Sequence, residues 1–198
     1  MPAVNFEHKK YYTIMDGKIC LQHKTKNANT VSRINKQGRE VHEQYFSALA
    51  GKITDIYTRD SDYGKTWNVE IDGSEILQFQ YSGGYANGFL KALPNVDFEQ
   101  EVIIIPDSKT EGDKKKTTIF LQQNKKSLKW FYTKDDPNGL PPLRKIKVKG
   151  KDTWDDSDAM EFLENMVKEK IKPLLKGSAG AAVNEDAEGD INNEDAPF

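Results

Sequence analysis

Apolar and polar residues alternate along most of the chain between residues 11 and 133, which is the period of half-buried β-strands. The alternation is clearest in residues 65–71, where Trp67, Val69 and Ile71 are apolar positions. Similar runs predict further strands, in residues 11–15, 18–22, 43–59, 75–81, 101–106, 117–123 and 128–133. The pattern therefore predicts a mainly β protein.

Glycine-containing turns separate several of these strands. Asp16-Gly17 and Asp72-Gly73 can supply the positive φ values of two-residue hairpin turns. Gly51 lies inside the long run 43–59 and predicts a bend or bulge there. We expect a long, basic, mobile excursion in residues 23–39, where the apolar break at Val31 and Ile34 leaves a short strand open. Residues 60–64 predict a turn, residues 109–116 a charged loop and residues 135–142 a proline-rich connection.

Two segments change to the helical period. Residues 84–93 place Tyr85, Phe89 and Leu93 on one helical face, and Pro94 prevents continuation of the helix. Residues 155–172 predict the one long helix, with aspartates at its start and lysines at its end, as the helix dipole favours.

An apolar stripe runs along this long helix, which Pro173 and Gly177 are expected to end. The stripe consists of Met160, Leu163, Val167, Ile171 and Leu174. We expect it to pack on the strands. A contact between copies of the chain is the alternative, so a homo-oligomer stays open at this point.

The order of the central elements is a long bent strand, two strands, a short helix and two further strands. This is the element order of the OB-fold, a partly open five-stranded barrel that binds oligonucleotides. We therefore predict that residues 1–176 form an OB-fold-like five-stranded barrel with an extra N-terminal hairpin, a short helix between strands 3 and 4, and one C-terminal helix.

Charge divides the chain into a basic body and an acidic tail. All 29 Lys and Arg, and 25 of the 31 acids, precede Gly177. Residues 177–198 contain the other six acids and almost no large apolar residue, so we expect this tail to be disordered. A net charge near zero thus hides a basic body, which suggests a polyanionic partner.

The last five residues of the tail place an acidic pair before an aromatic residue with a free carboxylate. These residues are Glu194, Asp195, Ala196, Pro197 and Phe198. This tip resembles the acidic C-terminal tip of bacterial single-stranded-DNA-binding proteins, and phage proteins of this kind also have acidic tails ending in Phe. The resemblance covers the tail alone, about a tenth of the chain. It implies single-stranded DNA binding by the body and recruitment of replication or repair proteins by the tip. The alternative is a generic solubilising tail.

Aromatic and basic residues are interleaved on the predicted strands, as base stacking and phosphate binding together require. The predicted DNA-binding residues are Lys52, Tyr57, Arg59, Tyr63, Lys65, Trp67, Tyr81, Tyr85, Lys129, Trp130 and Phe131. Strict alternation also places Trp67 with core residues, and Trp130 with Leu128. For these two tryptophans, a core position and a stacking position both stay open.

Motifs for catalysis and for cofactors are missing. Gly64-Lys65-Thr66 lacks the upstream glycine that a phosphate-binding loop needs, because residue 59 is Arg. Three His and Cys20 have no metal-ligand spacing, and a single Cys allows no intrachain disulfide. We expect a protein that is not an enzyme and needs no cofactor or metal.

The chain has no apolar run long enough to span a membrane, and its polar start does not resemble a signal peptide. We therefore expect a cytoplasmic protein of a bacterial cell or a phage-infected host. The leading hypothesis is non-sequence-specific binding of single-stranded DNA in replication, recombination or repair. The alternatives are a non-enzymatic scaffold protein and an RNA-binding OB protein. The sequence does not separate DNA from RNA binding, because that discrimination depends on local contacts with the 2′-hydroxyl.

Overall fold

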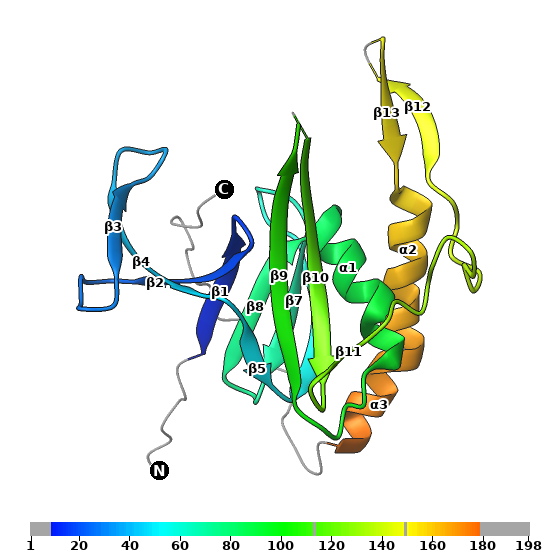
Figure 1. Cartoon of the computed structure of the whole chain (residues 1–198), viewed down its shortest axis with the longest axis horizontal. Helices are drawn as coiled ribbons and strands as arrows, with labels where there is room; N and C mark the ends of the chain where they lie inside the picture. The colour runs from blue at the N-terminus through cyan, green and yellow to red at the C-terminus, as the bar shows by residue number, and fades with distance from the viewer. Residues whose placement is uncertain (1–8, 113, 149, 179–198) are drawn as a thin grey trace.

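The computed structural model describes residues 9–112, 114–148 and 150–178 (Figure 1). The fold is mainly β, as predicted, with a seven-stranded, a four-stranded and a two-stranded sheet. One buried core includes residues of the two larger sheets and of the helices, among them Trp67, Phe89, Ile104 and Leu163. No helix in the described part of the chain is long and apolar enough to cross a membrane.

The seven-stranded sheet joins the N-terminal strands to the central ones. Its strands in spatial order are β3 (Val31–Ile34), β4 (Glu40–Phe46), β2 (Lys18–His23), β1 (Lys10–Met15), β8 (Glu75–Gln80), β7 (Thr66–Ile71) and β6 (Ile53–Arg59). Neighbours are antiparallel except β1 and β8, which pair in parallel. Both predicted turns exist, with positive φ at Asp16, Gly17, Asp72 and Gly73. The first has two residues, because Met15 pairs with Lys18, whereas the second has three, because Ile71 pairs with Glu75.

The four-stranded sheet has the order β11 (Lys126–Ser127), β10 (Lys114–Gln123), β9 (Val102–Glu111) and β5 (Leu49–Gly51). The chain leaves this sheet at Gly51 and enters the larger one at Ile53. Gly51 has φ 155°, and a Cβ there would lie 2.5 Å from Ile71 Cγ2, so only glycine fits. The predicted bend is therefore confirmed.

The two larger sheets do not close into a barrel, because no described pairing joins β8 to β10. Helix α1 (Gly84–Ala92) contacts both strands, and chiefly β10. A Cβ on Gly88 would lie 2.6 Å from the backbone nitrogen of Ile119, so the helix approaches β10 more closely than any larger residue would allow. A helix packed this closely occupies space that β8 would need to reach β10.

Two predicted elements in the second half of the sheet were wrong. Residues 109–116 are not a loop, because β9 and β10 continue as a paired hairpin to Glu111 and Lys114. Residues 128–133 are not a strand. The backbone nitrogen of Phe131 donates to the carbonyl of Lys91 (2.7 Å), and Asn95 Nδ2 donates to the carbonyl of Lys129 (2.9 Å). These bonds hold the segment at the end of α1 and at the short 3-10 helix η1 (Leu93–Asn95) instead.

The predicted C-terminal helix exists but is longer than expected. It comprises α2 (Ser157–Met166), a π-helical turn η2 (Val167–Ile171) and α3 (Lys172–Ser178). Pro173 lies inside it, because the wider π turn changes the hydrogen bonding just before the proline. The extra residue of that turn also rotates the buried face, so Leu175 is buried and Leu174 is 56% exposed. The rest of the predicted stripe packs in the common core.

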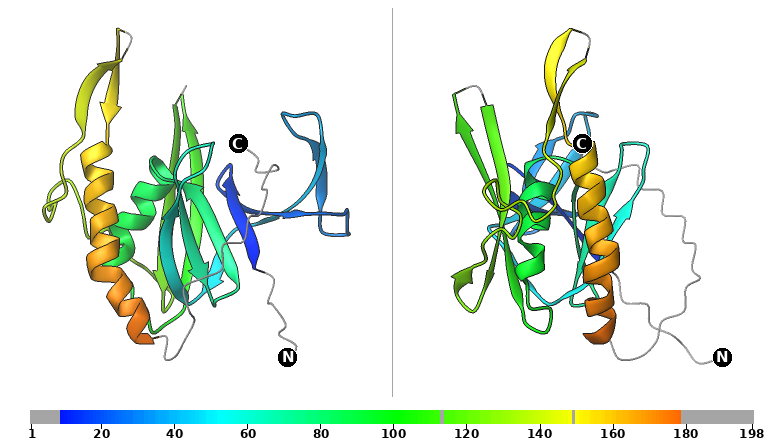
Figure 2. Two further views of the ribbon diagram at one scale, coloured as in Figure 1. Left: turned by 180° about the vertical axis from the view of Figure 1, so that it is seen from behind. Right: turned by 90° about the vertical axis from the view of Figure 1, so that its right-hand side faces the viewer.

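Strand β3 is the short strand that was left open within the predicted basic excursion, and it pairs with β4. One element was absent from the prediction. Strands β12 (Arg144–Val148) and β13 (Lys151–Asp155) form a two-stranded ribbon that projects from the body just before α2 (Figures 1 and 2).

Candidate nucleic-acid interface

The seven-stranded sheet has one face in the core and one face directed away from it. The core face carries Trp67 and Val69 of β7. On the opposite face, here called the outer face, Tyr57, Asn68 and Gln78 lie side by side in register across β6, β7 and β8. Because side chains alternate along each strand, this face is polar where the core face is apolar.

An amide pair lies at the centre of this row. Gln78 Nε2 donates to Asn68 Oδ1 at 2.7 Å. Asn68 is only 1% exposed, and its Nδ2 has no hydrogen-bond partner among the described residues. An unpaired buried donor is unusual and often marks a functional position. Because this nitrogen is itself buried, a ligand on the outer face reaches it only if the neighbouring side chains move.

An open groove of about 870 Å³ continues the outer face from β8 across β1, β2 and β4. Tyr11, Thr13, Cys20 and Gln78 contribute to its lining. Among the described residues, the charged side chains that line it are four cations and one acid: Lys9, Lys10, Lys24, Arg39 and Glu40. The groove therefore attracts anions.

Two of these cations are held by acids at the edge of the groove. Lys9 Nζ lies 2.5 Å from Glu70 Oε2, and Lys10 Nζ lies 3.6 Å from Glu75 Oε1. Both lysine side chains stay about half exposed, at 43% and 60%. The Glu70 and Glu75 side chains are only 16% and 24% exposed, so a phosphate that binds these lysines has to compete with the two carboxylates.

Two tyrosines offer aromatic surface beside these charges. Tyr11 is 38% exposed within the groove. Burial first, and then the nearby Tyr11, Glu70 and Asp55, raise the pKa of Tyr57 to about 12, while Arg59 opposes the shift. The Tyr57 hydroxyl therefore stays protonated at neutral pH and can donate a hydrogen bond.

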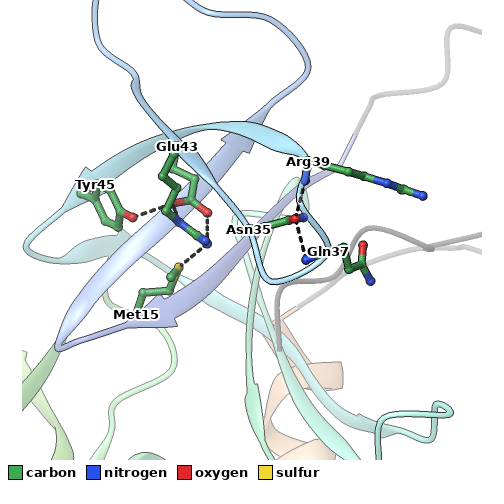
Figure 3. Close-up of polar contacts among 7 residues, drawn as sticks. Met15, Asn35, Gln37, Arg39, Glu43 and Tyr45 are labelled. Atoms are coloured by element: carbon green, nitrogen blue, oxygen red, sulfur yellow. Dashed lines mark hydrogen bonds and ion pairs between the residues drawn. The ribbon is translucent and has the colours of Figure 1, made fainter.

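A buried ion pair holds the β3–β4 hairpin next to the groove (Figure 3). Arg33 Nε and Nη2 donate to the two carboxylate oxygens of Glu43, both at 2.6 Å. The hydroxyl of Tyr45 also donates to Glu43, at 2.6 Å. Glu43 is 1% exposed, so three charge-assisted hydrogen bonds compensate its burial.

Burial, and then Glu43, raise the pKa of Cys20 to about 11, so this thiol is not a reactive thiolate at neutral pH.

The loop between β3 and β4 is shaped by one asparagine. Asn35 Oδ1 accepts hydrogen bonds from the backbone nitrogens of Gln37 (3.0 Å) and Arg39 (2.9 Å). Figure 3 shows the Arg39 side chain extending away from this turn. The turn therefore fixes the backbone of the arginine that lines the groove.

Four of the residues predicted to bind DNA lie on or near the surface of β6 and its loops. Tyr57 and Arg59 are outer-face positions of β6, and Tyr63 in the following turn is 55% exposed. Lys52 is exposed between β5 and β6, where its backbone nitrogen donates to Asp72 Oδ1 (2.9 Å). Tyr57, Arg59 and Tyr63 are thus compatible with one surface, and Lys52 lies at the other end of β6.

Three predicted residues have structural roles instead. Trp67 is 1% exposed and its indole nitrogen donates to the carbonyl of Tyr81 (3.0 Å), so it lies in the core and offers no stacking surface. The Tyr81 ring stacks on Trp67, with centroids 5.7 Å apart, and its hydroxyl donates to Glu164 (2.7 Å). Lys65 Nζ binds the same carboxylate at 2.7 Å.

The other predicted residues come from different elements and do not join this face. The hydroxyl of Tyr85 on α1 accepts a hydrogen bond from the backbone nitrogen of Gly17 (3.0 Å). Trp130, Phe131 and the neighbouring Lys129 lie in the irregular segment at the end of α1. Trp130 is 44% exposed, and Lys91 Nζ lies 5.8 Å from its ring centroid.

The residues that line the groove were missed by sequence reasoning. Lys9, Lys10, Tyr11, Lys24 and Arg39 all lie in the N-terminal strands or their connections. A sequence signal existed, because residues 9–39 are rich in Lys and Arg. The missing information was the parallel pairing of β1 with β8, which joins these strands to the central sheet.

Comparisons with protein-family models, curated proteins and solved structures found no match to this chain. Among the described residues, no group of three or more His, Cys, Asp or Glu side chains could hold a metal ion. The predicted partner-binding residues Glu194, Asp195, Ala196, Pro197 and Phe198 lie outside the described residues, as does almost all of the acidic tail.

Proposed function

We propose that this protein binds single-stranded DNA without sequence preference, and that the strand lies along the outer face and the groove. The observation that carries the proposal is the groove itself, where the described lining residues include four cations, one acid and the 38% exposed Tyr11. A single strand offers phosphates and unstacked bases together, and a basic groove with aromatic side chains binds both.

The order of the elements supports an OB-like arrangement for this binding body. The continuous stretch β5–β6 contributes to both larger sheets, and β7, β8, α1, β9 and β10 follow in the OB order. In OB-folds the ligand lies on the face of strands 2 and 3 and on the loops after strands 1 and 4. Strands 2 and 3 correspond here to β7 and β8, whose outer face carries Asn68 and Gln78.

The N-terminal strands would extend this binding face. They continue the sheet beyond β8 through the parallel pairing of Lys10, Tyr11 and Tyr12 with Glu75, Ile76 and Leu77. The groove is formed mainly by these added strands. We therefore assign most phosphate contacts to the added strands, and base contacts to Tyr11 and Tyr57.

The acidic tail would act in replication, recombination or repair by recruiting partner proteins through Glu194–Phe198. Phe198 offers an apolar ring, and Pro197 limits the backbone freedom lost on docking. Deletion of Phe198 should abolish partner capture while leaving DNA affinity nearly unchanged. Capture of the same polymerase, primase or helicase by the deletion variant would contradict this role.

The proposal is tested by fluorescence anisotropy with labelled oligo-dT, oligo-U and duplex DNA over a range of salt concentrations. We expect oligo-dT to bind much more tightly than the duplex, with an affinity that falls steeply as salt rises. Equal affinity for duplex and single strand would contradict the proposal. Tighter binding of oligo-U than of oligo-dT would identify RNA as the ligand instead.

A further inference from the structure

The β12–β13 ribbon is a second basic and aromatic surface, separate from the groove. Within the described part of the chain its two strands pair only with each other, and Figures 1 and 2 show them projecting from the body. Isolated two-stranded sheets are marginally stable, so the base of the ribbon matters. There, Arg144 forms an ion pair with Asp158 of α2, and Asp155 Oδ1 accepts a hydrogen bond from the backbone nitrogen of Ser157 (3.1 Å). The ribbon is thereby anchored to the start of the long helix.

An exposed tryptophan lies on one face of this ribbon. Trp154 is 65% exposed and is the cross-strand partner of Lys145. Lys147 lies two residues further along the same face, opposite Asp152. Lys145 Nζ lies 2.7 Å from Asp152, a pair with both side chains about half exposed. The face therefore presents a large aromatic ring beside two lysines.

The charge of the ribbon indicates what could cover this ring. Residues 143–155 contain five cations and two acids: Arg144, Lys145, Lys147, Lys149, Lys151, Asp152 and Asp155. Protein–protein interfaces are enriched in Trp but depleted in Lys, so the two lysines that β12 places beside the ring argue against a protein partner. A single-stranded nucleic acid satisfies both features, since its bases stack on aromatic rings and its phosphates attract lysines.

We propose that the ribbon is a second binding site for the DNA strand, in which Trp154 stacks on a base and Lys145 and Lys147 bind neighbouring phosphates. This inference rests on the proposed function and adds a site that is separate from the groove. The ribbon and the β3–β4 hairpin lie at opposite ends of the molecule (Figures 1 and 2). A DNA strand that occupies both the groove and the ribbon must cross the body of the protein. A short oligonucleotide therefore fills one of the two sites at a time.

Tryptophan fluorescence tests the stacking directly. Trp67 is buried, whereas Trp130 and Trp154 are 44% and 65% exposed. The variant Trp130→Phe leaves Trp154 as the only solvent-exposed indole among the described residues. Saturating oligo-dT of about 30 nucleotides should quench the emission of Trp154 in this variant. This length exceeds the roughly 4–16 nucleotides that one OB-fold covers. Unchanged emission at saturation would overturn the inference.

Affinity provides the second readout, with a matched control on the other face of the ribbon. Trp154→Ala should weaken binding of the long oligo-dT by about 5- to 150-fold, the range expected for loss of one base stack. Ile146→Ala removes a 39% exposed side chain from the opposite face and should leave the affinity unchanged. Both residues are exposed, so neither substitution should unfold the protein, and circular dichroism checks this.

The outcomes separate the two proposals. If the wild-type protein binds oligo-dT and Trp154→Ala binds it equally well, the ribbon site is wrong and the proposed function stands. If the wild-type protein does not bind oligo-dT at all, the proposed function is wrong, and the ribbon site is wrong with it. An equal loss of affinity with Ile146→Ala would show that the ribbon acts through its fold and not through base stacking.

Discussion

Lys65 Nζ lies 2.7 Å from Glu164 Oε2 and thereby joins the start of β7 to the middle of the C-terminal helix. The same carboxylate accepts hydrogen bonds from Tyr81 (2.7 Å) and from Lys168 (2.8 Å). Burial alone would raise the pKa of Glu164, but these three partners outweigh it and lower the pKa from 4.5 to about 2. Glu164 thus holds the helix against the sheet in its ionised form.

Glu164→Gln should lower the free energy of unfolding by about 3 kcal/mol at pH 7, because lowering the pKa from 4.5 to about 2 corresponds to a stabilisation of that size. This stabilisation is fully present above pH 4.5, the pKa of Glu164 in the unfolded chain. It is lost as the pH falls through about 2, the pKa of Glu164 in the folded protein. The difference between wild type and variant should therefore shrink between about pH 4.5 and pH 2. Urea denaturation at several pH values measures this.

The matched control is Glu161→Gln, an exposed position on the same helix, where we expect a change within about 0.5 kcal/mol. A Glu164→Gln variant as stable as wild type at pH 7 would contradict the role of this carboxylate. A difference that persists unchanged down to pH 2 would also contradict it.

The Arg33–Glu43 pair predicts a local effect on the wall of the groove. Arg33→Met leaves Glu43 buried without its charge partner, which typically costs about 3–5 kcal/mol. We expect faster amide hydrogen exchange in β3 and β4, and weaker binding of oligo-dT, because these strands position Arg39. Lys36→Met, an exposed residue of the same loop, is the control. Unchanged exchange in β3 and β4 would show that the pair does not hold the hairpin.

The variant Gly88→Ala should be less stable than wild type, although helix propensity alone favours Ala over Gly. In an exposed helix, Ala is favoured over Gly by about 1 kcal/mol. Here a Cβ would lie 2.6 Å from the nitrogen and 2.9 Å from the oxygen of Ile119. Gly88→Ala should therefore destabilise the protein by about 1–3 kcal/mol, through overpacking against β10. A stabilised variant in thermal denaturation would show that α1 is free to move away from β10.

Local features of the fold could be predicted from the sequence. The hairpin turns at Asp16-Gly17 and Asp72-Gly73, the bend at Gly51 and the helix beginning at Gly84 depend on neighbouring residues, and the structure has all of them. The strand predicted at residues 128–133 does not form, because its backbone bonds to the end of α1, which lies more than 30 residues earlier in the chain. Local periodicity contains no information about such a partner.

The candidate site was harder to predict than the fold for the same reason. Alternation left Trp67 open between the core and the surface, and the structure places it in the core with Tyr81 stacked on it. The groove depends on β1 pairing with β8 in parallel, a contact between residues more than 60 positions apart. Tyr57 and Arg59 were predicted to bind DNA, and that stays a prediction; the structure places both on the outer face of β6, where strand parity puts them.

The acidic tail is predicted to compete with DNA for the basic body. Six acids tethered to the body have a high effective concentration near the groove, and their attraction is strongest at low ionic strength. Truncation after Ser178 should raise the affinity for oligo-dT at low salt, with a gain that shrinks as salt rises. A full-length variant with the six acids changed to amides should behave like the truncation. Equal or weaker binding by both variants would show that the tail does not reach the DNA site.

The most direct test of the account is the salt dependence of oligo-dT binding by Lys24→Gln/Arg39→Gln, two cations that line the groove. If each contacts a phosphate, the slope of log K against log salt should become shallower by roughly 1.4, since each contact with a single strand contributes about 0.7. The control Lys134→Gln/Lys170→Gln removes the same charge from exposed residues that do not line the groove. The account predicts a shallower slope for the groove variant alone. Identical slopes for the two variants would contradict binding of the strand in the groove.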